Sequence, residues 1–139
     1  DKSKKAQYDK MVRNIKYVYP YAQLVRRILL ETYEYIETLP PGKEREQHIK
    51  AVEKGIKEQY EPTVRKISRS NGKLLVKLID RECHQTCYQM IKAFCGPVKA
   101  NFYQGIAYTF GYNLNKHYHP EDEDKEIERI VQMVESNQL

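Results

Sequence analysis

Residues 11–39 read MVRNIKYVYPYAQLVRRILLETYEYIETL, and their apolar positions recur at alternating intervals of four and three. The members of this series are Met11, Ile15, Val18, Ala22, Val25, Leu29, Thr32, Ile36 and Leu39. Such spacing lines one face of an α-helix in a heptad-like pattern. The pattern keeps its phase across Pro20, which removes one backbone hydrogen bond from a helix interior. We therefore predict one long helix kinked near Pro20, or two nearly collinear helices, ending at Leu39-Pro40-Pro41-Gly42.

Turn-forming residues separate the next two predicted helices. A second helix is expected from about Lys43 to Tyr60, disturbed by Pro62. The residues that we expect on its inward face are Ile49, Val52, Ile56 and Tyr60. The segment Ser70-Asn71-Gly72 is typical of a turn, and a third helix is expected after it. This third helix places Leu74, Leu75, Leu78 and Ile79 against the core.

Three more helices are predicted in the second half of the chain. The capping box Thr86-Cys87-Tyr88-Gln89 marks a helix start, so we expect a break near His84. Gly96 is a natural helix end and Pro97 suits the first turn of the following helix. The apolar residues of that helix lie four apart: Val98, Phe102, Ile106, Phe110 and Leu114. Pro120 and the acidic residues 121–124 favour the start of a last helix, because negative charge offsets the helix dipole. Its predicted buried residues are Ile127, Ile130, Val131 and Val134.

Length and composition are consistent with one helical domain. The chain has 139 residues, the usual size of a single domain, and 31% of them are charged. No run of 18 apolar residues is present, so no transmembrane segment is predicted. We predict an all-α, single-domain helical bundle over residues 1–139, with a long N-terminal helix and about five shorter ones. Residues 1–5 are expected to form a disordered basic tail.

Charge is unevenly distributed along the chain. Residues 1–80 contain 18 basic and 11 acidic residues, whereas residues 81–139 contain 6 and 8. A basic arm can bind nucleic-acid phosphates or anionic lipid. This alternative predicts one exposed basic face made of Lys10, Arg13, Lys16, Arg26 and Arg27. The simpler interpretation is that the oppositely charged ends attract one another or stay solvated.

Cysteine and histidine residues define the candidate metal ligands. Cys83, His84 and Cys87 are close in sequence, and His117 and His119 form an HxH pair. Structural zinc sites commonly use C-x2-C spacing, whereas Cys83 and Cys87 are spaced C-x3-C. Free cysteine is among the most buried residue types, so we favour ordinary core thiols. A Cys83–Cys87 disulfide and metal ligation stay open as alternatives, and no cofactor is predicted.

The densest group of ionisable residues is Asp80, Arg81, Glu82 and His84, with Tyr88 one turn further along. Such a group can contain a general base tuned by its neighbours. An ordinary ion pair at a helix end explains it at least as well. No nucleophile elbow, phosphate-binding loop or HExxH motif is present. A small enzyme that uses this cluster is therefore the alternative hypothesis, and a non-catalytic protein is the preferred one.

The chain contains twelve tyrosines and no tryptophan. Five of the tyrosines crowd the first predicted helix: Tyr17, Tyr19, Tyr21, Tyr33 and Tyr35. Tyrosine offers apolar area with a polar tip, which suits protein interfaces. Tyrosines beside basic residues can also stack on single-stranded nucleic acid. We expect a protein partner, and this hypothesis predicts an exposed patch of apolar residues and tyrosines.

Two segments, Tyr17-Val18-Tyr19-Pro20-Tyr21-Ala22 and Leu30-Glu31-Thr32-Tyr33-Glu34-Tyr35-Ile36-Glu37, resemble a family of uncharacterised proteins from Bacteroidetes-type bacteria. The likeness continues through residues 72–81, 86–88, 102–104 and 118–120, so it spans nearly the whole chain. At Cys83-His84 the chain departs from the Gly-containing turn of that family. The resemblance is to a domain of unknown function, so it implies no catalytic or binding residues. It does imply an exported protein of the periplasm or cell envelope, in agreement with a chain that starts at Asp1.

Overall fold

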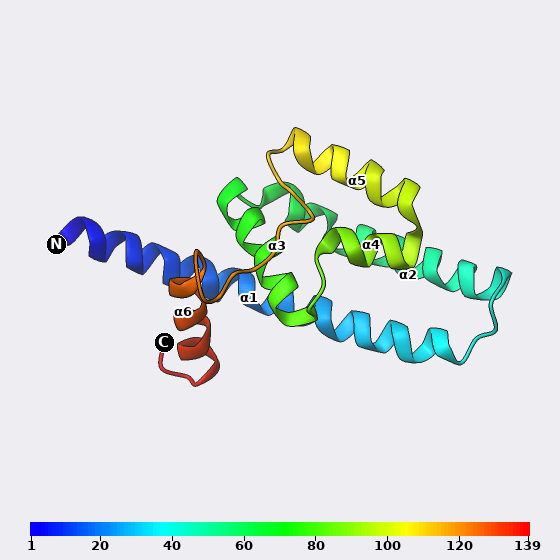
Figure 1. The fold of residues 1–139 in the computed structure, drawn as a ribbon, viewed down its shortest axis with the longest axis horizontal. Coiled ribbons are helices and arrows are strands. Elements are labelled where there is room, and N and C mark those ends of the chain that lie inside the picture. Colours follow the sequence, from blue (N-terminus) through cyan, green and yellow to red (C-terminus); the bar gives the residue numbers. More distant parts are fainter.

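The computed structural model describes all of residues 1–139 and contains six helices and no strand (Figure 1). The helices are α1 (Lys2–Glu37), α2 (Lys43–Lys66), α3 (Arg69–Cys83), α4 (Cys87–Cys95), α5 (Pro97–Thr109) and α6 (Lys125–Glu135). The predicted all-α, single-domain class is therefore confirmed. α1 is continuous across Pro20, and residues 2–5 form its exposed first turn. None of the six helices has the length and apolar character that crossing a membrane requires.

α1 runs along most of the molecule; α2, α3 and α6 pack against it, and α5 packs against α4 (Figure 1). The apolar series of the sequence faces inward as predicted. Ile15, Val18, Ala22 and Ile36 are buried, and Met11, Val25, Leu29 and Thr32 are half-buried between them. The heptad-like spacing is thus a reliable guide to the inward face of this helix.

The main core lies where the first half of α1 meets α3 and α6. Ten buried residues form it: Ile15, Val18, Tyr19, Ala22, Leu78, Ile79, Met90, Tyr118, Ile130 and Val131. Ile15, Leu78 and Ile130 are fully shielded from solvent. We call this region, residues 2–22 of α1 together with α3 and α6, the packed end. We call residues 23–37 of α1 with α2, α4 and α5 the groove end.

The prediction of a turn at Ser70-Asn71-Gly72 is wrong, because these residues form the first turn of α3. Ser68 caps this helix, its hydroxyl oxygen accepting the N–H of Asn71 at 3.1 Å. Gly72 is buried, and a methyl group at this position would overlap the phenol ring of Tyr112. Glycine is needed here for close approach instead of a turn. α2 likewise continues through Pro62 to Lys66 instead of ending near Tyr60.

The break between α3 and α4 is confirmed in detail. His84 ends α3 in the left-handed conformation, with φ 55°. The Thr86 hydroxyl oxygen accepts the N–H of Gln89 at 3.1 Å, and the Gln89 side chain accepts the N–H of Thr86 at 2.9 Å. Gly96 then ends α4 and Pro97 begins α5, as expected.

α5 exposes most of the apolar residues that lie four apart in its sequence. The helix ends at Thr109 instead of reaching Leu114, and Ala100 and Ala107 are its buried residues. Four of the five residues in this series are exposed, with 83% of Val98, 63% of Phe102, 43% of Ile106 and 60% of Phe110 accessible. The spacing of the apolar residues alone therefore does not select the inward side of α5. The two small alanines allow the closest approach of a neighbouring helix and decide the orientation.

The last helix begins later than predicted. The segment 120–124 forms turns, and α6 starts at Lys125. Asp124 is buried just before it, where its carboxylate accepts the Lys77 ammonium at 2.6 Å and the N–H of His119 at 2.8 Å. Ile130 and Val131 are buried as predicted, and Ile127 and Val134 pack against the core.

Candidate functional site

An apolar groove of about 630 Å³ opens at the groove end. Of the 24 residues that line it, 21 are hydrophobic. Its walls come from α1, α2, α4 and α5, through side chains such as Ile28, Ile56, Phe94 and Ile106. Pockets for ligands and binding segments have volumes of roughly 300–1,000 Å³ and walls of this composition. The groove therefore has the size and lining of a binding site.

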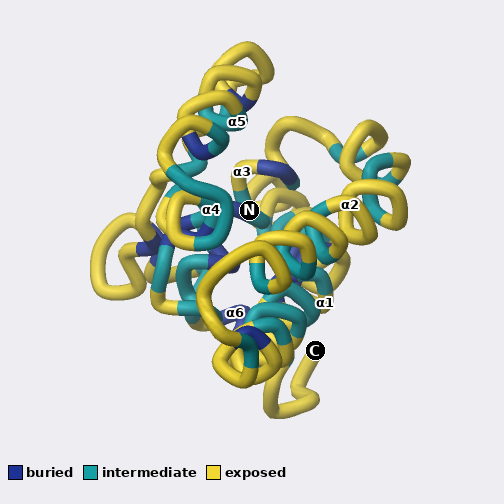
Figure 2. Tube along the Cα trace, turned by 90° about the vertical axis from the view of Figure 1, so that its right-hand side faces the viewer, coloured by how far each residue is buried: buried dark blue, intermediate teal, exposed yellow.

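The groove exists because α2 does not pack tightly against the other helices. No residue of its 24 is buried, and Figure 2 shows this helix with half-buried and exposed residues only. The residues predicted to face inward do so only as far as the groove, where Ile49, Val52 and Tyr60 are half-buried and Ile56 is exposed. Their predicted inward direction is therefore confirmed, but they have no tightly packed neighbour.

Polar contacts hold α2 at two places. At its start, the Arg45 guanidinium donates to the backbone carbonyls of Ile36 at 3.2 Å and Leu39 at 2.8 Å. This contact fixes the turn between α1 and α2. The second contact lies near the middle of α2 and involves α4 and α5.

The second contact is centred on Glu53, which lines the groove. Its carboxylate accepts the Lys99 ammonium at 2.7 Å and the Tyr103 hydroxyl at 2.8 Å, with the Cys95 sulfur 3.8 Å away. Burial raises the pKa of Glu53, but the hydrogen bonds from Lys99 and Tyr103 outweigh it and lower the pKa below its ordinary value. The carboxylate therefore stays charged at neutral pH and bridges α2 to α5.

One cation at the groove has no acidic partner. Lys57 lies one turn after Glu53 and lines the groove, and it forms no ion pair. Glu53 is already neutralised by Lys99. The polar part of the groove therefore carries an excess of positive charge.

Apolar surface continues from the groove onto the outer face of α5. Ile106 and Phe110 belong to the groove lining, and Phe102 and Val98 extend the same stripe along the helix. On the other side, Tyr33 is 40% exposed and packs edge-on against Phe94 with ring centroids 5.0 Å apart. The structure thus presents exposed apolar and tyrosine side chains together, as the interface hypothesis predicts.

The predicted catalytic cluster is divided among several contacts. Arg81 donates to Glu128 of α6 at 2.7 and 3.0 Å, to Glu135 at 3.1 Å and to Glu82. Tyr19 of α1 donates to Glu135 at 2.9 Å. Hydrogen bonding to Glu128 raises the pKa of Arg81, and the same contact lowers the pKa of Glu128. Arg81 and Glu82 therefore join α1, α3 and α6.

The other members of that cluster have separate surroundings. Asp80 accepts the N–H of Tyr118 at 2.8 Å and lies 3.5 Å from the His117 ring. His84 is exposed at the end of α3, and the Tyr88 hydroxyl donates to Asn101 at 2.6 Å. None of Asp80, Arg81, Glu82, His84 and Tyr88 lines the apolar groove.

The candidate metal ligands are also separated. All three cysteines are free thiols, and burial raises the pKa of Cys87 to about 12. The His119 ring lies 4.0 Å from Glu123, apart from the Asp80 contact of His117. No group of three or more His, Cys, Asp or Glu side chains is arranged to hold a metal ion.

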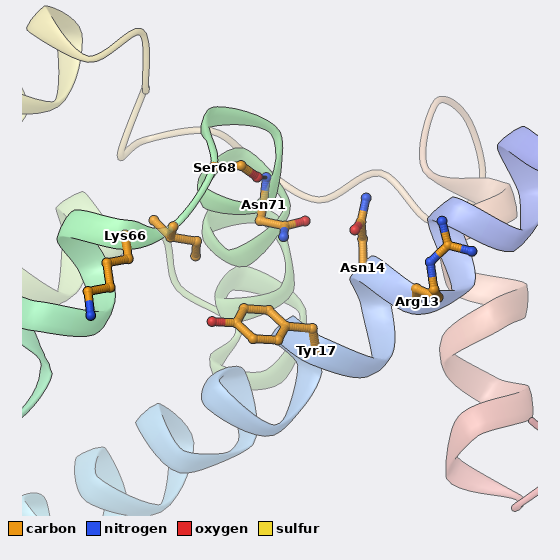
Figure 3. Close-up of a pocket in the computed structure, with 7 residues that line it drawn as sticks. Arg13, Asn14, Tyr17, Lys66, Ser68 and Asn71 are labelled. Carbon is orange, nitrogen blue, oxygen red and sulfur yellow. Dashed lines mark hydrogen bonds between the residues drawn. The ribbon is translucent and has the colours of Figure 1, made fainter.

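A second, polar pocket of about 420 Å³ lies beside the first half of α1 (Figure 3). Seven residues line it: Arg13, Asn14, Tyr17, Lys66, Ile67, Ser68 and Asn71. Of these, Arg13 was predicted as part of a basic arm, whose five residues are all exposed on α1, and Tyr17 as one of the crowded tyrosines. Lys66 at the end of α2 and Asn71 at the start of α3 were not predicted as site residues, since only the packing of these helices brings them near Arg13.

A family model described as Domain of unknown function (DUF4294) matches residues 1–133. The chain belongs to this family. Comparison with curated proteins and with solved structures finds no match. DUF4294 membership names no ligand or reaction, so function has to be argued from the groove and the polar pocket.

Proposed function

We propose that this DUF4294 domain is a non-catalytic binding protein whose apolar groove takes an amphipathic helical segment of a protein partner. The observation that carries the proposal is the groove itself, about 630 Å³ in volume with 21 hydrophobic residues among 24. Apolar surface left in contact with water is unfavourable by roughly 25 cal/mol per Å². A partner that covers these walls recovers this free energy.

The surroundings of the groove favour a protein segment over a small molecule. The apolar stripe on α5 extends past the groove to Phe102 and Val98, farther than a compact ligand inside the groove would reach. Amphipathic helices bind such grooves through apolar side chains at positions i, i+3 or i+4, and i+7. Lys57 is unpaired, so the segment is expected to place an acidic side chain beside it.

A selection from a library of helical peptides tests the proposal. Peptides that bind the purified domain are sequenced, and their affinities are measured by fluorescence anisotropy. We expect apolar residues at helical spacing with an acidic residue at one end. Ile56→Lys places a charge in the groove at an exposed position and should weaken binding by at least about tenfold.

The matched control is Leu30→Lys, the same kind of change at an exposed α1 position outside the groove. It should leave the affinity unchanged. If no peptide binds, or if both variants bind equally well, the groove is not a helix-binding site. Binding of a fatty acid or detergent in place of any peptide would assign the groove to a small amphiphile instead.

Export to the periplasm or cell envelope is the location that we propose for this activity, supported by the family resemblance. Fractionation of cells that produce the natural protein tests this location. The chain should be found with the envelope fractions, and recovery with cytosolic marker enzymes would contradict the proposal.

A further inference from the structure

The polar pocket contains four polar side chains without partners. Arg13, Asn14, Lys66 and Asn71 make no side-chain hydrogen bond or ion pair with any other residue. Figure 3 shows Arg13 and Lys66 on opposite sides of the pocket, with Asn14 and Asn71 facing one another between them. The Oδ1 atom of Asn71 is shielded from solvent and has no hydrogen-bond partner. Buried polar atoms in proteins are normally satisfied, so the Asn71 oxygen is available to accept a hydrogen bond from a bound group.

The charge of the pocket specifies the sign of that ligand. Two of the seven lining residues are cations and none is acidic. The mostly buried Lys77 and Arg81 are neutralised by Asp124 and Glu128, whereas the exposed Arg13 and Lys66 have no acidic partner. The first turn of α3, which borders the pocket, contains Arg69 and no acidic residue. No acidic residue lines the pocket, so a bound anion would offset its positive charge.

The donor types fit a phosphoryl group. A guanidinium binds phosphate oxygens through two parallel N–H groups, and an ammonium adds a compact positive charge. The carboxamides of Asn14 and Asn71 supply further N–H donors. A bare phosphate dianion has no donor for the Asn71 oxygen, whereas a hydroxyl group on a phosphate ester has one. A pocket of about 420 Å³ holds the phosphate and a small hydroxylated group attached to it.

We propose that this pocket binds a phosphate ester that carries a hydroxyl group. Arg13 and Lys66 hold the phosphate, and Asn71 accepts from the hydroxyl. The chemistry is shared by free glycerol phosphate and by the head group of phosphatidylglycerol, and the experiment separates these two sources. The pocket shares no lining residue with the apolar groove, so the binding proposals for the two sites can be tested independently.

Binding is measured on the full chain with a ¹H–¹⁵N NMR titration. The probes are inorganic phosphate, glycerol 3-phosphate, and vesicles of phosphatidylglycerol or phosphatidylcholine. We expect glycerol 3-phosphate to shift signals of Asn14, Tyr17 and Asn71 and to bind at least about tenfold more tightly than inorganic phosphate. Selective binding to phosphatidylglycerol vesicles, with weak binding of the free ester, would also support the site and assign it to a lipid surface.

Two charge-matched double variants make the test specific. Arg13→Gln with Lys66→Gln should abolish binding, whereas Arg27→Gln with Lys50→Gln removes the same charge from exposed positions outside the pocket and should preserve it. Asn71→Asp adds a negative charge in the first turn of α3, which favours the helix, and should still abolish binding. Absence of binding to every phosphate probe overturns the proposal. So does binding that is equally weakened by both double variants, since that result reports only net charge.

Discussion

The packed end and the groove end use the same long helix in opposite ways. In its first half, α1 buries Ile15, Val18 and Ala22 against α3 and α6, with no accessible surface on these three side chains. In its second half the same apolar series lines an open groove, because α2 contributes no buried residue. A sequence pattern can therefore direct side chains inward without ensuring that another surface covers them.

The two ends also differ in how charged side chains join their helices. At the packed end, Arg81 joins α3 to α6 through Glu128 and Glu135, and Lys77 pairs with the buried Asp124. At the groove end, Glu53 is the carboxylate that bridges α2 to α5. The packed end is thus held by apolar contact and ion pairs together. The groove end depends on a few polar contacts around the open apolar groove.

The largest expected difference comes from the same truncation at both ends. Ile130→Ala removes a fully buried side chain of the packed end and should lower the free energy of unfolding by about 2–5 kcal/mol. Ile56→Ala changes a groove residue that is 39% exposed and should cost less than about 1 kcal/mol. Urea denaturation measures both values. Equal losses would show that the groove end is packed as tightly as the core.

Removal of Arg81 tests the ion pairs of the packed end. Arg81→Met keeps part of the apolar stem but leaves Glu128 and Glu82 without their cation, and should cost roughly 2–3 kcal/mol. Lys99→Met is the matched change at the groove end. Lys99 is 45% exposed, so its loss should cost clearly less than the loss of Arg81. A larger loss for Lys99→Met would reverse the comparison.

Alanine substitutions at two glycines should change the stability of the protein in opposite directions. Gly72→Ala puts a methyl group into the ring of Tyr112, and the required shift should cost about 1–2 kcal/mol despite the better helix propensity of alanine. Gly55→Ala in α2 meets no atom within 4 Å and should stabilise the protein by about 0.5–1 kcal/mol. Thermal unfolding of the two variants measures the difference. If Gly72→Ala also stabilises the protein, Tyr112 does not pack where the structure places it.

The smallest effect is the dependence of stability on acid pH. Hydrogen bonds from Arg81 lower the pKa of Glu128 below its ordinary value of 4.5. A lowered folded-state pKa gives stability that is fully present above pH 4.5 and is lost as pH falls through the folded-state value. Glu128→Gln should therefore flatten the fall in unfolding free energy between pH 5 and pH 3, by no more than about 1 kcal/mol. A slope equal to that of the wild type would show that Glu128 gains nothing from Arg81.

Much of the fold could be predicted from local patterns. The inward face of α1, the break at His84 and the start of α4 at Thr86 each depend on residues close together in the sequence. Apolar spacing predicts the inward face of α1, because side chains repeat around a helix with a fixed period. Capping predicts the others, because the Thr86 and Gln89 side chains satisfy backbone groups a few atoms away.

The predictions failed where the deciding contact joins residues that are far apart in the sequence. Gly72 was assigned to a turn because its need for close approach comes from Tyr112, 40 residues later. The start of α6 was placed too early because Asp124 is held by Lys77 of α3. The spacing of the apolar residues of α5 did not reveal that most of them are exposed, because the side that meets a neighbour depends on the packing of α4 and α5.

By itself the sequence determined the helical class, the faces of the amphipathic helices and most of their ends, since these depend on contacts within one or two turns. Only the tertiary structure decided that α2 stands away from the core, that Glu53 meets Lys99 and Tyr103, and that Arg13 and Lys66 share a pocket. Those outcomes depend on how whole helices pack. The shape of a groove or pocket between helices depends on many side chains that are far apart in the sequence, so local residue spacing does not predict it.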